Sequence, residues 1–287
     1  MNRPALYWEA LEKGAVCCRL CPHNCVIGPS QFGFCGARQN TGGELIAASY
    51  SRVSSLALDP IEKKPLRLFK RGSAVLSIGS FGCNLRCGFC QNASISAEYG
   101  DALEQADTLP PEALAAFAVT VVEKGNIGVA YTYNEPLIGY EYVLDAAKLV
   151  RAAGLSNILV TNGFINSEPL QELLPFIDAM NIDLKGFTAG FYERVFGGLD
   201  AVKQTITAAA RRCHVEVTTL VIPGENEADV EPIAEWIASV DPDIPLHLTR
   251  FFPRYKYVGK EPTRRETLQT LAETAKKHLK HVFAGNV

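Results

Sequence analysis

From residue 74 onward, short apolar runs alternate with longer stretches in which apolar residues recur at helical spacing. Runs of the first kind are typical of buried strands, and stretches of the second kind are typical of amphipathic helices. The expected strands are 74–78, 127–131, 157–161, 179–183, 214–220, 246–249 and 281–284. The expected helices are 110–124, 140–153, 169–174, 191–195, 201–212, 227–240 and 264–279. This alternation predicts an α/β fold, a parallel sheet with helical crossovers that closes fully or partly into a barrel.

The first part of the chain has no such alternation. Residues 6–13 are expected to form a short helix, 44–56 are strand-like, and 59–70 (DPIEKKPLRLFK) read as a charged connector broken by proline. We therefore predict two units: a small cysteine-rich N-terminal domain at 1–58 and a larger barrel domain at 59–287.

Composition places the chain among ordinary globular proteins. Of its 287 residues, 47% are hydrophobic and 21% are charged, and no apolar run approaches the roughly 20 residues that span a bilayer. The first residues lack the pattern of a secretory signal, so a cytoplasmic location and no membrane partner are expected. The net charge of −3 and the pI near 6.0 do not indicate nucleic-acid binding.

Three cysteines stand close together directly after the expected strand 74–78. Cys83, Cys87 and Cys90 lie within the stretch GCNLRCGFCQN, whose glycines permit a tightly wrapped backbone. Three thiolates on so short a loop can reach three corners of one iron–sulfur cube. The next cysteine or histidine is Cys213, so the fourth corner is predicted to be left for a ligand other than protein.

A second group of cysteines lies in a Gly-, Pro- and Asn-rich segment near the N-terminus. Four thiolates at these spacings suit one metal centre, for which zinc in a closed site and a second iron–sulfur cluster both remain open. Cys17 is expected to be a spare, and His23 could replace one thiolate. The expected ligands are Cys18, Cys21, Cys25 and Cys35.

Polar residues recur where the expected strands end. In a parallel barrel these ends meet at one mouth, where active sites are found. Some of these residues are also ordinary turn formers, such as the pair Asn162-Gly163. As a set that surrounds a thiolate loop, they favour function. The segments are 80–90, 131–136, 161–164, 181–185, 221–224 and 247–250.

The cysteine motif, with Phe89 before its last cysteine, resembles the signature of the radical S-adenosylmethionine (SAM) superfamily, whose fold is a partial (β/α)6 barrel. Further segments are similar to the radical enzyme of the AmmeMemoRadiSam system, which is related to the activating enzymes of pyruvate formate-lyase. Together they cover nearly the whole chain. These segments are LCPHNC, GFCGAR, DPIEKKPL, SIGSFGCNLRCGFCQN, YTYNEP, TNGF, NIDLKGF, EVTTLVIPGEN and HLTRFFP.

The resemblance implies a radical enzyme. A 4Fe–4S cluster on Cys83, Cys87 and Cys90 would bind S-adenosylmethionine at its fourth iron. The reduced cluster would cleave it to methionine and a 5′-deoxyadenosyl radical, which abstracts hydrogen from a substrate. An electron donor such as flavodoxin or ferredoxin is implied. Proteins of the Memo and AMMECR types, or a protein substrate, are possible partners.

The resemblance also assigns roles to residues after the later strands. A carboxylate at Glu135, beside Asn134, would bind the methionine ammonium group, although the two glycines of the superfamily motif are here Tyr133 and Asn134. Residues after the third and fourth strands are expected to contact the ribose and carboxylate groups of S-adenosylmethionine. The residues concerned are Thr161, Asn162 and Asp183.

The remaining expectations concern the adenine and the substrate. Val221 would pack against the adenine or serve in the core, and Phe89 would lie by the adenine or cover the cluster. Lys185 matches the DLK motif of the activating enzymes, although Val160 stands where those enzymes usually have Asp. Arg250 and His247 are expected on the side from which the substrate enters. For His247, a structural role in the core is the alternative.

Two other functions remain open. The first is activation of a glycyl-radical enzyme, and the second is a non-catalytic iron–sulfur electron carrier. Carriers of the ferredoxin type ligate each cluster with four cysteines, so the three-cysteine loop favours an enzyme. Many relatives continue beyond a GNVPG segment into a further cysteine-rich piece. Because this sequence stops at GNV, that module is expected to be missing.

Overall fold

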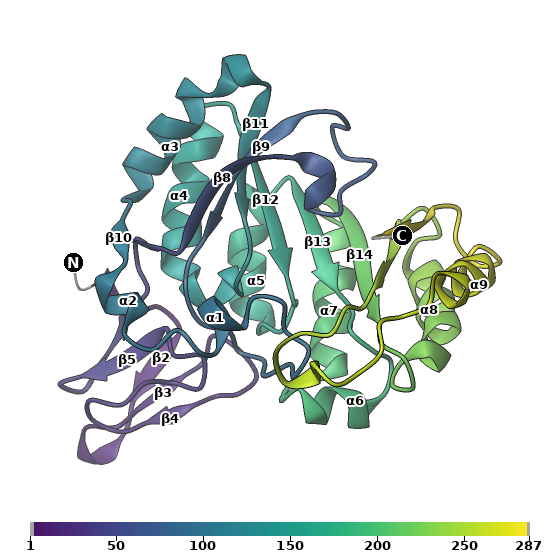
Figure 1. The fold of residues 1–287 in the computed structure, drawn as a ribbon. Helices are drawn as coiled ribbons and strands as arrows, with labels where there is room; N and C mark the ends of the chain where they lie inside the picture. Colours follow the sequence, from purple (N-terminus) through teal and green to yellow (C-terminus); the bar gives the residue numbers. More distant parts are fainter. Residues whose placement is uncertain (1–2, 286–287) are drawn as a thin grey trace.

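The computed structural model of the chain, which describes residues 3–285, is built around one eight-stranded sheet (Figure 1). Seven strands are parallel and follow each other in chain order, and an eighth joins one edge in the antiparallel sense. The parallel strands are β9 (Ala74–Gly79), β11 (Asn126–Tyr131), β12 (Ser156–Thr161), β13 (Ala179–Asp183), β14 (His214–Val221), β15 (Leu246–Arg250) and β16 (Val282–Gly285). The antiparallel edge strand is β8 (Ser55–Pro60). The edge strands β8 and β16 do not pair within the described residues, so the sheet is a partial barrel, and the predicted fold class is confirmed.

Helices connect the parallel strands. α3 and α4 pack against β11, α4 also packs against β12, α7 against β14, and α9 against β15 and β16. The strands from β9 to β14 are buried along almost their whole length, as expected of parallel strands covered by helices, whereas the edge strand β16 is half-buried. The helices are α1 (Ala93–Ser96), α2 (Ala102–Gln105), α3 (Pro111–Thr120), α4 (Tyr140–Ala152), α5 (Ser167–Leu173), α6 (Ala189–Arg194), α7 (Leu199–Ala210), α8 (Val230–Val240) and α9 (Arg265–Ala275).

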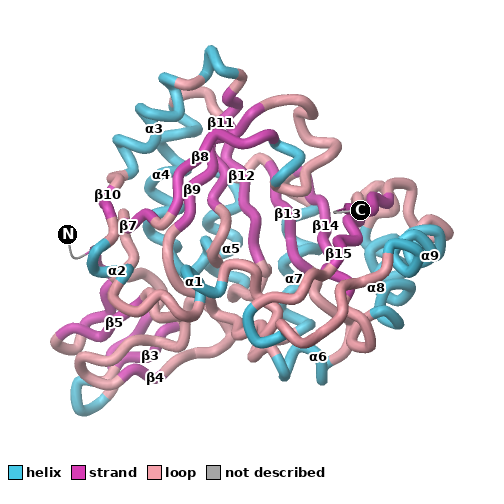
Figure 2. Tube along the Cα trace, viewed as in Figure 1, coloured by secondary structure: helices cyan, strands magenta, loops and turns pink. Residues whose placement is uncertain are grey.

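The N-terminal region forms small antiparallel sheets at the end of the barrel toward which the parallel strands point (Figure 1). One sheet contains β1 (Arg3–Pro4), β6 (Glu44–Ala47) and β5 (Arg38–Thr41), and another contains β2 (Trp8–Ala10), β3 (Val16–Cys18) and β4 (Val26–Ile27). A third pairs β7 (Arg52–Val53) with β10 (Asp107–Thr108). In the tube view, loops fill the space between these sheets and the ends of the barrel strands (Figure 2).

The expected helix at 6–13 is wrong. Trp8 pairs with Cys18 in a strand, and a single 3-10 turn follows at Glu12–Gly14. Residues of helical propensity become a strand here because pairing with β3 satisfies the backbone, and tertiary context overrides weak local preference.

The N-terminal region is tied to the barrel by a buried ion pair. Arg38 on β5 donates through Nη2 to Glu141 Oε1 on α4 at 2.7 Å, and both side chains are almost fully buried. β8 begins at Ser55 and pairs with β9 in the main sheet. The division into 1–58 and 59–287 stays a prediction.

None of the helices in the described part of the chain is long and apolar enough to span a membrane. The expectation about the end of the chain concerns Asn286 and Val287, which lie outside the described residues.

Candidate functional site

The loop that follows β9 brings Cys83, Cys87 and Cys90 to the mouth of the partial barrel. The three thiols are half-buried. Asn134, after β11, fastens this loop: its Oδ1 accepts from the backbone N–H of Ser80 at 3.0 Å, and its Nδ2 donates to the carbonyl of Gly82 at 3.1 Å. These two hydrogen bonds therefore hold the backbone directly before Cys83 in place.

The thiols of Cys83 and Cys87 are protonated at neutral pH unless a cation binds them. Burial raises the pKa of the Cys87 thiol to about 11 and that of Cys83 further still. A metal centre would reverse this preference, because metal ligands are thiolates and metal binding releases their protons. The donor set therefore fits an iron–sulfur cluster held through three irons.

Glu135 organises the ends of two neighbouring strands. It is 3% exposed, and its carboxylate accepts from Thr161 Oγ1 at 2.6 Å, from the Asn162 N–H at 2.7 Å and from the Leu137 N–H at 3.0 Å. Burial raises the pKa of this carboxyl to about 7, although the three hydrogen bonds oppose the shift. A carboxylate has about four acceptor positions, so about one remains for a ligand.

Asp183 and Lys185 form an ion pair at the end of β13. Lys185 Nζ lies 2.9 Å from Asp183 Oδ2. Burial alone would lower the pKa of Lys185, but the Asp183 carboxylate and the thiolate form of Cys87 outweigh burial and raise that pKa. The pair thus lies beside the cysteine loop, and the Lys185 ammonium group is its positively charged member.

The aromatic and apolar candidates line the same mouth. Phe89 is buried and packs against Phe191 and Tyr257, with ring centroids 6.2 and 5.7 Å apart. Val221 is fully buried at the end of β14, where its carbonyl accepts from Thr263 Oγ1 at 2.6 Å. The described contacts agree with a core position for both side chains as well as with a binding wall.

The structure does not bring His247 into this group, whereas Arg250 pairs with Val221 where β15 and β14 end. His247 is near the start of β15, buried, with Nε2 2.6 Å from Glu216 Oε2. Arg250 donates through Nε to the carbonyl of Thr263 at 2.6 Å. Both side chains are engaged in contacts that support the sheet and its following loop.

Asn84 is a site residue that the sequence reasoning missed. It is 1% exposed, and its amide donates to the carbonyl of Phe164 at 2.6 Å and accepts from Asn162 Nδ2 at 2.9 Å. Asn162 Nδ2 also lies 3.6 Å from Cys83 Sγ. The available signal was the place of Asn84 inside the cysteine motif, where an amide can bond to a neighbouring loop.

The N-terminal cysteines surround a pocket of their own. Cys17 is not among its lining residues, and its sulfur faces the carbonyl of Asn24. His23 lies at the wall, with Nε2 2.7 Å from the carbonyl of Asn84. The cysteines that line this pocket are Cys18, Cys21, Cys25 and Cys35.

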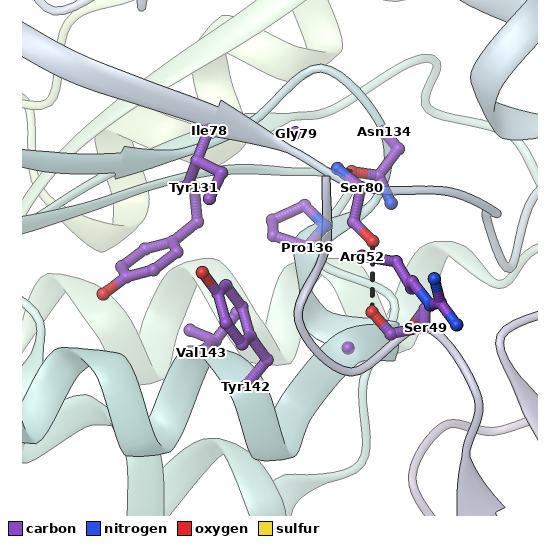
Figure 3. Close-up of a pocket in the computed structure, with 11 residues that line it drawn as sticks. Ser49, Arg52, Ile78, Gly79, Ser80, Tyr131, Asn134, Pro136, Tyr142 and Val143 are labelled. Atoms are coloured by element: carbon purple, nitrogen blue, oxygen red, sulfur yellow. Dashed lines mark hydrogen bonds between the residues drawn. The ribbon is translucent and has the colours of Figure 1, made fainter. Parts of the chain in front are cut away.

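A further pocket lies beside the ends of β9 and β11 (Figure 3). Tyr131 and Tyr142 form one side, and Ser80 and Asn134 lie at the other, where Ser80 Oγ is 3.5 Å from the Ser49 carbonyl. Of the predicted site residues, this pocket includes only Asn134, and it contains no cysteine, so the candidate chemistry lies elsewhere.

Comparison with known proteins agrees with this geometry. Residues 77–237 match the Radical SAM superfamily. An uncharacterized protein of Methanocaldococcus jannaschii is 39% identical over 293 residues, which cover 99% of this chain and 85% of the relative. Another protein of that organism, named as a candidate glycyl-radical enzyme activating enzyme, is 26% identical over 233 residues, covering 76% of this chain and 90% of the relative.

The fold is also found among solved structures. The crystal structure of QueE from Escherichia coli aligns with a TM-score of 0.51 and 16% identity, over 82% of this chain and 93% of that chain. At this identity the likeness concerns the fold alone.

Proposed function

The chain belongs to the radical SAM superfamily, and we propose that it is an enzyme that reductively cleaves S-adenosylmethionine and abstracts hydrogen from a substrate. The family implies a 4Fe–4S cluster with S-adenosylmethionine as co-substrate. One observation carries the proposal: Cys83, Cys87 and Cys90 stand on a single loop at the mouth of the parallel barrel. Three thiolates leave one iron of the cluster for another ligand.

When bound, the cluster supplies one electron that breaks the C5′–sulfur bond of the co-substrate and leaves methionine and a 5′-deoxyadenosyl radical. The residues of this chain bind and orient. Asn134 fixes the cysteine loop. The acceptor position that Glu135 leaves free would accept a hydrogen bond from the methionine ammonium group. Thr161 and Asn162 hold the Glu135 carboxylate in place.

Two residues at the end of β13 and just beyond it, Asp183 and Lys185, supply opposite charges next to the loop. We assign Asp183 to a polar group of the co-substrate and Lys185 to the side from which the substrate enters. Phe89 and Val221 are assigned to the adenine wall, because both are buried at the same mouth. For His247 and Arg250 the proposed substrate-side role lacks support from their contacts.

The test is anaerobic reconstitution followed by turnover. Wild-type protein given dithionite and S-adenosylmethionine is expected to release 5′-deoxyadenosine, and Cys87→Ala is expected to abolish the release. Cys213→Ala serves as the matched control, since Cys213 precedes β14 at the opposite end of the barrel. Release of 5′-deoxyadenosine by Cys87→Ala would contradict the proposal. Wild-type protein that holds its clusters but releases no 5′-deoxyadenosine would also contradict it and would favour an electron carrier.

At the finer level, we assign the chain to the AmmeMemoRadiSam group, on the ordered motifs from LCPHNC to HLTRFFP. This assignment brings Memo-type and AMMECR-type proteins or a protein substrate as partners, a flavodoxin or ferredoxin as electron donor, and a cytoplasmic location. Co-purification of tagged chain with a Memo-type protein tests it, and absence of any complex would count against it.

Activation of a glycyl-radical enzyme is the second candidate. It is favoured by the relative named as a candidate activating enzyme, which matches 76% of this chain. Val160 counts against it, because the activating enzymes usually have Asp there. The test is incubation with a glycyl-radical enzyme, followed by electron paramagnetic resonance (EPR). A glycyl-radical signal would favour activation of such an enzyme over hydrogen abstraction from another substrate.

A further inference from the structure

Four thiols from the N-terminal region converge on one enclosed pocket. Three of them, Cys18, Cys21 and Cys35, are buried, and Cys25 is half-buried. A cluster of buried thiols without disulfides fits a metal centre, whose binding supplies the free energy to deprotonate them.

The spacing of the sulfurs separates the two candidate metals. In a tetrahedral zinc site with Zn–S bonds of about 2.3 Å, the sulfurs lie about 3.8 Å apart. Among the described residues, the one group of three or more metal-ligand side chains whose atoms all lie within 4.8 Å is Glu231, Glu235 and His278 on the surface. No three cysteine sulfurs meet this limit, either in the N-terminal pocket or on the loop after β9.

Sulfurs that surround one pocket but stand further apart than a single ion allows fit a polynuclear group. A cubane distributes its four protein ligands over four irons, so that its ligand sulfurs are separated by the cluster itself. On the loop after β9, whose family uses a 4Fe–4S cluster, no three sulfurs lie within 4.8 Å of one another either. In this respect the N-terminal cysteines agree with the cysteines of a cluster-binding loop.

A buried arginine faces the pocket with unused hydrogen-bond donors. Arg38 is 1% exposed and lines the pocket, and its Nε and Nη1 have no hydrogen-bond partner. Such donors cost free energy when left without acceptors. Hydrogen bonds to the sulfurs of a cluster would satisfy them and would offset its negative charge.

The two cysteine sites are direct neighbours. A Cβ on Gly82, the residue before Cys83, would lie 2.4 Å from the carbonyl oxygen of Cys35, so the two backbones are in contact. Asn84 lines the N-terminal pocket and is hydrogen-bonded to Asn162, whose amide reaches Cys83 Sγ. The segment 82–84, which carries the ligand Cys83, therefore lies directly against the N-terminal pocket.

We propose that Cys18, Cys21, Cys25 and Cys35 hold a second iron–sulfur cluster that passes single electrons, across the segment 82–84, to the cluster on Cys83, Cys87 and Cys90. The electron-transfer part rests on the proposed function. A one-electron donor protein of the flavodoxin or ferredoxin class is oxidised and reduces the N-terminal cluster. That cluster is then reoxidised as it reduces the second one, and no bond forms or breaks and no proton moves.

Metal content tests the first half without any turnover. Anaerobically reconstituted wild type is expected to hold about eight irons per chain. A Cys21→Ala and Cys35→Ala double variant, and a separate triple alanine variant at 83, 87 and 90, should each hold about four, with an EPR signal after reduction. One zinc per chain that is lost from the double variant, or no metal lost from it, overturns the proposal even if 5′-deoxyadenosine is formed.

Reduction kinetics test the second half. The cluster on Cys83, Cys87 and Cys90 is recognised by an EPR signal that changes when S-adenosylmethionine is added. The rate at which this signal appears is measured in wild type and in the double variant, after mixing with either reduced flavodoxin or dithionite. The ratio of the flavodoxin rate to the dithionite rate is expected to fall several-fold in the double variant. An unchanged ratio overturns the electron transfer. A signal that fails to respond to S-adenosylmethionine in wild type points instead to failure of the proposed function.

Discussion

Glu216, on β14, is a single residue whose charge stabilises the barrel away from the site. Its buried carboxylate accepts from the backbone N–H groups of Arg67 and Leu68 at 3.0 and 2.8 Å, and from His214 and His247. Burial alone would raise the pKa of Glu216, but these four partners lower it to about 2. The side chain thus fastens the connector after β8 to the barrel.

This lowered pKa predicts a pH-dependent stability. A carboxyl whose folded pKa lies below its unfolded value of about 4.5 stabilises the fold above that value and loses the contribution as pH falls toward about 2. Glu216→Gln should cost about 1–3 kcal/mol at neutral pH, because the two backbone N–H groups bind different carboxylate oxygens and one of these becomes an NH2 group that cannot accept. The gap from wild type, measured by urea denaturation, should shrink below about pH 4.5. A constant gap would contradict this, and the exposed Glu273→Gln is the control.

Gly82 lets the two cysteine sites approach each other. Its φ is +88°, and an added Cβ would collide with the Cys35 carbonyl. Gly72, at φ +83°, has open space around it and is a matched control. Left-handed strain alone should cost about 1 kcal/mol in Gly72→Ala, whereas Gly82→Ala should cost more and weaken the docking of the N-terminal loop. Anaerobic thermal unfolding measures the stability loss of both variants. Equal losses would show that the backbone at Cys35 moves away from the added Cβ without cost.

At the scale of elements, the sequence reasoning succeeded where periodicity is local. Apart from the short elements α1, α2 and β10, which were not predicted, the strands and helices from β9 to β16 lie close to the predicted ranges, and β13 (Ala179–Asp183) has the predicted limits. It failed at β2, where the partner strand decides the conformation. Neighbouring loops could be grouped because parallel strands end on one side of a sheet. Contacts such as Glu216 with Arg67, or Asn84 with Asn162, depend on loop paths that no local pattern encodes.

At the scale of the whole molecule, the pair of cysteine sites exists only while the N-terminal region is docked on the barrel. Glu141 on α4 is central to this docking: it is fully buried, and its Oε1 accepts from Arg38 Nη2 at 2.7 Å and from the backbone N–H of Leu6 at 2.6 Å. Removing one partner of a buried ion pair leaves the other charge uncompensated.

Glu141→Ala is therefore expected to lower the free energy of unfolding by about 3–5 kcal/mol, whereas exposed ion pairs contribute at most about 1 kcal/mol. Lys280→Ala, which removes the exposed pair with Asp243, is the control. Urea denaturation measures both costs, and limited proteolysis should show earlier cleavage of the N-terminal region in Glu141→Ala. The variant should also lose iron from the N-terminal cysteines before the loop after β9 loses its own. Equal stability of the two variants would mean that the region docks without the buried pair, through contacts such as Tyr7 with Tyr140.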